Sequence, residues 1–117
     1  MSHHPIWVIC LCAQWCHICR DLTDDYQRLR ATLPGVRWCW VDIEDEEHLL
    51  GDLDITTFPT YLIGDSEGVR LFAPGPNQAE ALARFVRPYL SGKVAALVHD
   101  PAVQQAFQAI QAHQAIS

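Results

Sequence analysis

Apolar and polar residues follow one another along this chain with a period that changes between segments. The segment Ile6–Cys12 is short, continuously apolar and rich in β-forming residues, which predicts a buried strand. From 16 to 33, apolar residues recur every three or four positions, as on one face of an amphipathic helix. Pro34-Gly35 follows directly and is expected to end that helix.

The remaining segments extend this alternation of strands and helices. They predict a strand over 36–43 with Trp38 and Trp40 on one face, a short helix over 45–51, strands over 60–63 and 69–72, a helix over 77–90 capped by Asn77, and a last helix opened by Asp100-Pro101. A helical crossover makes the first two strands parallel, and a hairpin makes the last two antiparallel. The pattern predicts an α/β fold of order β-α-β-α-β-β-α, with a central mixed four-stranded sheet and a C-terminal helical extension.

Length and charge narrow the class of protein. The chain has 117 residues, enough for one domain, which we place at 1–91 with the extension at 92–117 packed on it. The formal net charge is −6, which argues against nucleic acid and anionic lipid as partners. The longest apolar run, Ile6–Ala13, is too short to span a membrane and lacks the flanks of a signal peptide. We expect a cytoplasmic protein that is a monomer or a weak dimer.

The segment Cys16-His17-Ile18-Cys19 is the candidate for chemistry, at the junction of the first strand and the first helix. Free backbone N–H groups and the positive end of the helix dipole stabilise a thiolate at Cys16, which predicts the nucleophile there. A protonated His17 would add to this effect. Cys19 lies one turn further on and is suited to attack a mixed disulfide and release the product.

The five cysteines could also serve other purposes than this one. A structural zinc site is disfavoured because no second Cys-x-x-Cys or spaced His pair exists, and Arg20 stands where a c-type haem motif needs His. Cys10 and Cys39 are expected to be buried core residues. Cys12 is also expected in the core, but it lies four residues before Cys16, so a role as a third redox thiol stays open.

The arrangement of these motifs resembles the thioredoxin family. A strand, the run Ala13-Gln14-Trp15-Cys16-x-x-Cys19, a helix, and Phe58-Pro59-Thr60 before a hairpin follow in the family's order over residues 6 to 91. The resemblance implies a thioredoxin-like fold and a thiol–disulfide oxidoreductase. Its redox-active Cys16–Cys19 disulfide would carry the reaction, and no metal or organic cofactor would be required. The resemblance further implies a cis-proline at Pro59, with Trp15 and Phe58 beside it to bind the substrate chain.

The chain departs from the family pattern at several positions. The first strand and helix are missing, Cys10 stands in place of a buried Asp, and Asp24 stands in place of a helix-kinking proline. His17 and Ile18 between the cysteines, together with Cys10, are expected to tune the redox pair. The expected partners are disulfide-containing proteins and an electron source that is thioredoxin-reductase-like or glutathione. The alternative is a non-enzymatic binding or redox-sensing module.

The missing first unit would leave the strand over 36–43 at an edge of the sheet. Exposed apolar edges are usually covered, because they invite aggregation. The last helix carries Val103, Phe107 and Ile110 on one side and needs a surface to bury them. We therefore expect this helix to pack near the Trp38 strand, with a place elsewhere on the sheet as the alternative.

Overall fold

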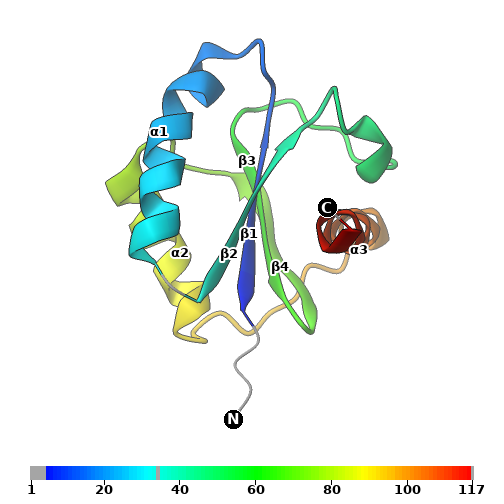
Figure 1. The fold of residues 1–117 in the computed structure, drawn as a ribbon. Helices are drawn as coiled ribbons and strands as arrows, with labels where there is room; N and C mark the ends of the chain where they lie inside the picture. The colour runs from blue at the N-terminus through cyan, green and yellow to red at the C-terminus, as the bar shows by residue number, and fades with distance from the viewer. Residues whose placement is uncertain (1–4, 34, 117) are drawn as a thin grey trace.

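A mixed four-stranded sheet lies at the centre of the computed structural model, which describes residues 5–33 and 35–116 (Figure 1). The strands are β1 (Ile6–Cys12), β2 (Val36–Asp42), β3 (Thr60–Asp65) and β4 (Gly68–Pro74), in the spatial order β2-β1-β3-β4. β1 and β2 are parallel, and the other two pairs are antiparallel. The predicted sheet is confirmed, with strand ends within two residues of those expected.

Helices cover both faces of this sheet. On one face lie α1 (His17–Thr32) and α2 (Ala79–Leu90), and on the other lie the short 3-10 helix η1 (Glu47–Leu49) and α3 (Pro101–Ile116) (Figure 1). Pro34, expected to end the first helix with Gly35, lies outside the described residues. Across the described ranges, none of the helices is long and apolar enough to cross a membrane.

The alternation of side chains along β1 divides the core into two halves. Val8, Cys10 and Cys12 face α1 and α2, whereas the residues between them face α3. β2 divides in the same way, with Trp38 on the α1 side and Cys39 on the α3 side, as the pattern predicts. Every residue of β1 is buried, so the sequence after it emerges from a fixed, fully packed strand.

The position of α3 differs from the expected one. α3 does not lie beside Trp38, whose ring packs against α1. It covers the opposite face instead, against β4 and η1. Phe107 is 2% exposed, meets the Trp7 ring edge-on at 6.3 Å between centroids, and lies over Gly64, where a Cβ atom would come within 2.8 Å of it. Trp38 and Trp40 of β2 already pack against Tyr26 of α1, so the apolar surface that remains for α3 is the opposite face of the sheet.

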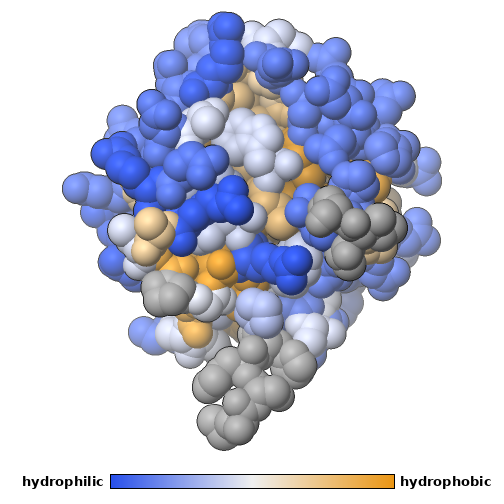
Figure 2. All heavy atoms as spheres, viewed as in Figure 1, coloured by the Kyte–Doolittle hydropathy of each residue, from blue (hydrophilic) through white to orange (hydrophobic). Residues whose placement is uncertain are grey.

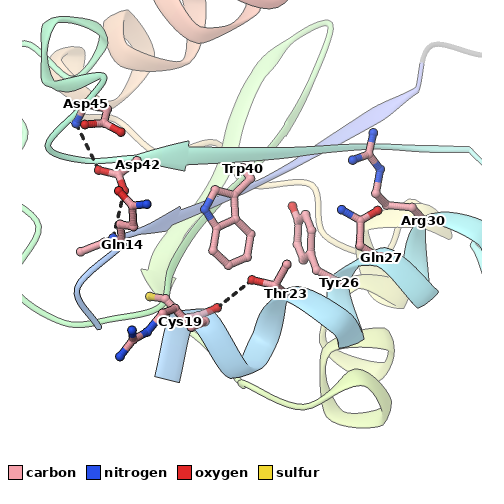
Figure 3. Close-up of a pocket in the computed structure, with 11 residues that line it drawn as sticks. Gln14, Cys19, Thr23, Tyr26, Gln27, Arg30, Trp40, Asp42 and Asp45 are labelled. Atoms are coloured by element: carbon pink, nitrogen blue, oxygen red, sulfur yellow. Dashed lines mark hydrogen bonds between the residues drawn. The ribbon is translucent and has the colours of Figure 1, made fainter. Parts of the chain in front are cut away.

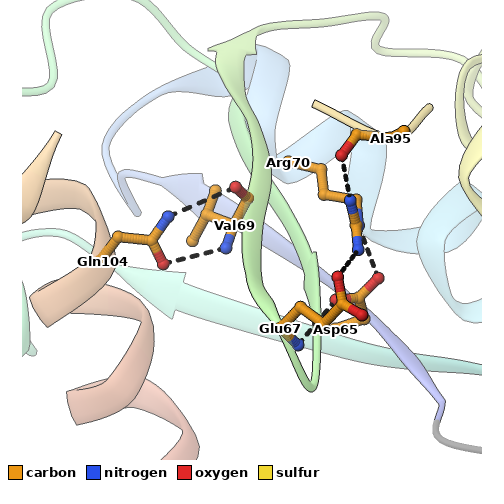
Figure 4. A network of polar contacts seen from close by, with 6 residues as sticks. All are labelled: Asp65, Glu67, Val69, Arg70, Ala95 and Gln104. Atoms are coloured by element: carbon orange, nitrogen blue, oxygen red, sulfur yellow. Dashed lines mark hydrogen bonds and ion pairs between the residues drawn. The ribbon is translucent and has the colours of Figure 1, made fainter. Parts of the chain in front are cut away.

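Polar contacts attach the extension to the outer edge of the sheet at β4 (Figure 4). The side-chain amide of Gln104 accepts a hydrogen bond from the Val69 N–H at 3.0 Å, and so occupies an edge group that lacks a strand partner. Arg70 donates to the Asp65 carboxylate at 2.7 Å and to the Ala95 carbonyl at 2.6 Å. The segment before α3 is therefore held against the β3–β4 hairpin.

The start of α2 also differs from the prediction. Asn77 is not its cap: the helix begins at Ala79, and its N-cap residue Gln78 makes no capping bond with its side chain. Instead the carboxylate of Asp25, from α1, accepts a hydrogen bond from the Ala79 N–H at 2.9 Å. That bond, with help from a hydrogen bond and ion pair to Arg28, lowers the pKa of Asp25. The cap comes from 54 residues away and ties α1 to α2.

β2 is the outer strand at the opposite edge and, among the described strands, pairs with β1 alone. Its Trp40 and Val36 side chains are half-buried against α1. Figure 2 shows the surface of the molecule from the same side as Figure 1. The surface over α1 is mostly hydrophilic there, and paler and hydrophobic residues lie in the middle of the view, between the helices. The candidate site lies at the end of this edge where β1 and β2 finish.

Candidate functional site

Cys16 is the N-cap residue of α1 and carries a free, half-buried thiol. A tight turn leads to it from β1, in which the Cys16 N–H donates to the Ala13 carbonyl at 3.0 Å. The Cys16 carbonyl then accepts the first helical bond, from the Arg20 N–H at 3.1 Å. The thiol thus lies at the end of a 16-residue helix where unpaired N–H groups and the helix dipole favour an anion. This is the position predicted for the nucleophile.

The disulfide bond of the structure joins Cys12 to Cys19, so the expected Cys16–Cys19 disulfide is wrong for this state. Cys12 ends β1 with its side chain on the α1 face, and Cys19 lies one turn into α1 with its side chain in the same core. Their Cα atoms are 5.8 Å apart, within the usual range for a disulfide. The strand end and the buried face of the helix therefore meet at a bonding distance that sequence spacing does not reveal.

Cys19 is the residue shared by two possible pairs. It is bonded to Cys12, and it lies three positions after Cys16, the N-cap residue of α1, which packs against the same core. Cys12 and Cys19 are 0% and 1% exposed, while Cys16 is half-buried and packs against the same core. Of the three thiol positions, Cys16 is the one that solvent reaches.

Trp15 and Phe58 form an aromatic rim beside Cys16. Trp15 is 63% exposed, and its ring meets the half-buried Phe58 ring edge-on at 5.4 Å between centroids. The Phe58–Pro59 peptide bond is cis, as the resemblance implies. Pro59 is buried, and its carbonyl accepts a hydrogen bond from the Gly75 N–H at 3.2 Å. Residues 43 positions apart in the sequence thus meet at one rim of the site.

The three residues expected to tune the pair have different surroundings. His17 is exposed and Ile18 is half-buried in the first turn of α1, and their tuning role stays a prediction. Cys10 is fully buried in the core, paired across the strands with Tyr61, and burial raises the pKa of its thiol far above the ordinary value. Cys10 is therefore a neutral group at neutral pH and cannot accept a proton as a carboxylate would.

Asp42, which the sequence analysis did not single out, fixes the loop that carries Cys16 (Figure 3). Its carboxylate accepts three backbone hydrogen bonds, at 2.9 Å from Gln14, at 2.9 Å from Glu44 and at 3.1 Å from Asp45. The first bond reaches across from β2 to the turn before Cys16, and the other two close the turn after β2. An Asp at the last position of a strand, before an acidic turn, was the available signal.

A pocket of about 340 Å³ opens beside Cys19, between α1 and the end of β2. Tyr26 and Trp40 form its aromatic wall, with their rings edge-on at 5.4 Å between centroids (Figure 3). Arg20 and Arg30 line it from α1, and Asp42 lies across from them. The pocket offers both aromatic surface and charge next to the disulfide. Within the described part of the chain, no cluster of three or more metal-ligating side chains occurs.

The site and its scaffold can be compared with known proteins. Residues 1–88 match the sequence model of the thioredoxin family. Thioredoxin-1 of Caenorhabditis elegans is 30% identical over 96 residues, which are 80% of this chain and 76% of that protein. A solved thioredoxin structure from Plasmodium falciparum superposes with a TM-score of 0.64 at 19% identity, over 75% of this chain and 85% of the other. The structure of a complex of ferredoxin:thioredoxin reductase with thioredoxin f2 gives a TM-score of 0.63 at 22% identity. The match covers 74% of this chain and 78% of the other.

Proposed function

Because the chain belongs to the thioredoxin family, we propose that it is a protein-disulfide reductase whose attacking group is the Cys16 thiolate. The observation that carries the proposal is a free, solvent-accessible Cys16 at the N-terminus of α1, one turn before Cys19, which is disulfide-bonded to Cys12. Thiolates at helix N-termini are the reactive form in such exchanges.

The reaction transfers two electrons to the substrate in two exchange steps. In reduced protein, the Cys16 thiolate attacks one sulfur of the substrate disulfide, which forms a mixed disulfide and expels the other substrate sulfur as a thiolate. The Cys19 thiolate then attacks the Cys16 sulfur, which forms the Cys16–Cys19 bond and releases the second substrate thiolate. Two protein thiols are oxidised to a disulfide, and one substrate disulfide is reduced to two thiols.

The rim formed by Trp15, Phe58 and Pro59 supports a role in holding the substrate chain. The exposed Trp15 ring offers apolar contact area next to Cys16. An extended peptide laid along Phe58 would pair with its backbone and bring a disulfide to the half-buried Cys16 sulfur. This mode of binding recognises backbone and apolar side chains, so it suits a range of protein disulfides.

Regeneration needs an external dithiol or thiol donor. A thioredoxin-reductase-like protein or glutathione in the cytoplasm would supply the electrons, and the similarity to thioredoxin f2 in its reductase complex supports a protein donor. The donor thiolate would attack the Cys16 sulfur of the Cys16–Cys19 disulfide and release the Cys19 thiolate, so that the donor takes the place that the substrate had in the mixed disulfide. No metal or organic cofactor enters this scheme.

Insulin reduction driven by dithiothreitol tests the proposal. We expect wild-type protein to accelerate the precipitation of the insulin B chain, and Cys16→Ser to abolish the acceleration. Cys39→Ser is the matched control, because Cys39 is a free cysteine buried on the other side of the sheet. Wild-type protein without activity above the dithiothreitol background would favour a non-enzymatic binding or redox-sensing module instead.

A further inference from the structure

We propose that Cys12 is a third redox cysteine, which takes over the bond to Cys19 after each turnover and sets Cys16 free again. The inference rests on the proposed function and adds an internal step to it. The observation behind it is the Cys12–Cys19 disulfide together with the free Cys16 thiol, since Cys12 and Cys19 belong to one cluster of the core and Cys16 packs against that cluster. The Cys-x-x-Cys spacing alone assigns no such part to Cys12.

Cys19 can form a disulfide with only one partner at a time, and in the structure that partner is Cys12. Cys12 lies at the end of β1 and Cys16 at the N-cap of α1, and the turn of residues 13 to 15 connects them. The Cα atom of Cys19, in the first turns of α1, lies 5.8 Å from that of Cys12. A disulfide exchange needs the attacking thiolate to approach the bond between the other two sulfurs, and Cys16 packs against the cluster that holds Cys12 and Cys19.

The step conserves atoms and electrons. After substrate reduction, the Cys12 thiolate attacks the Cys19 sulfur of the Cys16–Cys19 disulfide. The Cys12–Cys19 bond forms, the Cys16–Cys19 bond breaks, and Cys16 leaves as a thiolate. The proton lost by Cys12 passes to solvent, and no external oxidant or reductant takes part. Cys16 is a good leaving group here, because the start of α1 stabilises its negative charge.

Burial then controls how the oxidised protein is reduced again. Cys12 and Cys19 are at most 1% exposed, so an external thiol cannot reach either sulfur directly. The Cys16 thiolate first attacks Cys19 and restores the Cys16–Cys19 bond, with Cys12 as the leaving thiolate. A dithiol donor then attacks the accessible Cys16 sulfur. Cys16 is therefore the point through which electrons both leave and enter, and the buried bond stores the oxidised state.

Time-resolved mapping of the disulfides tests this relay. Fully reduced protein is mixed with an excess of insulin, quenched with acid at increasing times, alkylated with N-ethylmaleimide and digested for mass spectrometry. We expect Cys16–Cys19 peptides first and Cys12–Cys19 peptides later, with Cys16 then carrying the label in most chains. In Cys12→Ala, the Cys16–Cys19 bond should persist and the late labelling of Cys16 should be lost.

Matched variants separate the relay from a change in folding. Cys10→Ala removes another buried cysteine on the same face of β1 and should keep the transfer to Cys12. Cys12→Val fills the site of Cys12 differently from Ala, so agreement between the two variants excludes a packing effect. In Cys16→Ala that has been oxidised to the Cys12–Cys19 state, reduction by dithiothreitol should be at least about tenfold slower than in wild type.

Two results would overturn the relay. One is a Cys16–Cys19 bond that persists in wild-type protein while Cys12 stays labelled. The other is Cys12–Cys19 reduction at the wild-type rate in Cys16→Ala. Failure of the proposed function looks different, because insulin thiols would then not appear with any variant. In that case, oxidation with diamide replaces insulin, and the same peptide mapping still decides whether the bond passes from Cys16 to Cys12.

Discussion

Replacing Asp42 by Ala should loosen the loop that presents Cys16. The carboxylate accepts backbone hydrogen bonds from Gln14, Glu44 and Asp45, and the Gln14 bond is the one that holds the turn between β1 and α1. A hydrogen bond to a charged group contributes about 1.5–3 kcal/mol when buried. Asp42 is half-buried, so water partly replaces what is lost. We expect the three bonds together to be worth about 2 kcal/mol, a size that helix-cap losses also reach.

The assay combines thermal unfolding with the insulin reaction. For a chain of this size, about 2 kcal/mol corresponds to a Tm lower by about 6–10 °C. Insulin reduction should fall by about three- to tenfold, because Cys16 is then held less firmly in its reactive position. Asp42→Asn keeps one acceptor oxygen, so its Tm and its rate of insulin reduction should lie between those of wild type and Asp42→Ala.

Asp45→Ala is the control for this series. Its own backbone N–H still reaches Asp42, and its side chain is exposed at the same turn. It should leave both Tm and rate close to those of wild type. The reasoning is refuted if Asp42→Ala equals wild type in both measurements, or if Asp45→Ala is damaged to the same degree.

Three further predictions follow from the core. Phe107→Ala removes a side chain packed on Trp7 and should lower the free energy of unfolding by about 3–5 kcal/mol in urea titrations, and a loss below about 1 kcal/mol would contradict the packing of α3. Cys10→Asp should speed insulin reduction near pH 7, because a carboxylate at this position can accept a proton, whereas Cys10→Ala should not; the buried charge should lower the free energy of unfolding by about 3 kcal/mol. Equal rates for the two variants would argue against a role of this position in proton transfer. Burial raises the pKa of the Cys39 thiol from 9.0 to about 11, so the unfolded chain loses this proton at a lower pH than the folded protein. The contribution of Cys39 to the free energy of unfolding is therefore complete below pH 9 and falls between pH 9 and 11 by about 1.4 kcal/mol per pH unit. Cys39→Ala should make that decline shallower, and an unchanged slope would contradict the assignment.

The pattern of apolar and polar residues correctly predicted the helices, the strands and the two faces of the sheet. These features depend on residues that are close together in the sequence. The alternation in β2 places Trp38 and Cys39 on opposite faces, and Asp100 accepts a bond from the Ala102 N–H at 3.0 Å where the sequence predicts a helix start. The position of α3 could not be predicted in the same way. It depends on which sheet face the other helices leave open, and that is a property of the whole fold.

The site shows the same division between near and distant residues. The place of Cys16 at the helix start followed from the junction of a strand and a helix, and it is confirmed. The partner of Cys19 depends on the distance between a strand end and a helix face, so the spacing Cys-x-x-Cys led to the wrong bond in this state. Asp42 was missed because its contact with Gln14 spans 28 positions.

Trapping of the mixed disulfide tests the central claim most directly, that Cys16 is the sulfur which attacks substrate disulfides. Reduced Cys19→Ser protein is mixed with insulin, quenched with acid and analysed by mass spectrometry after digestion under non-reducing conditions. We predict a covalent complex joined through Cys16, and no complex with Cys16→Ser under the same conditions. A complex that forms equally well without Cys16, or one joined through Cys10, Cys12 or Cys39, would contradict the account.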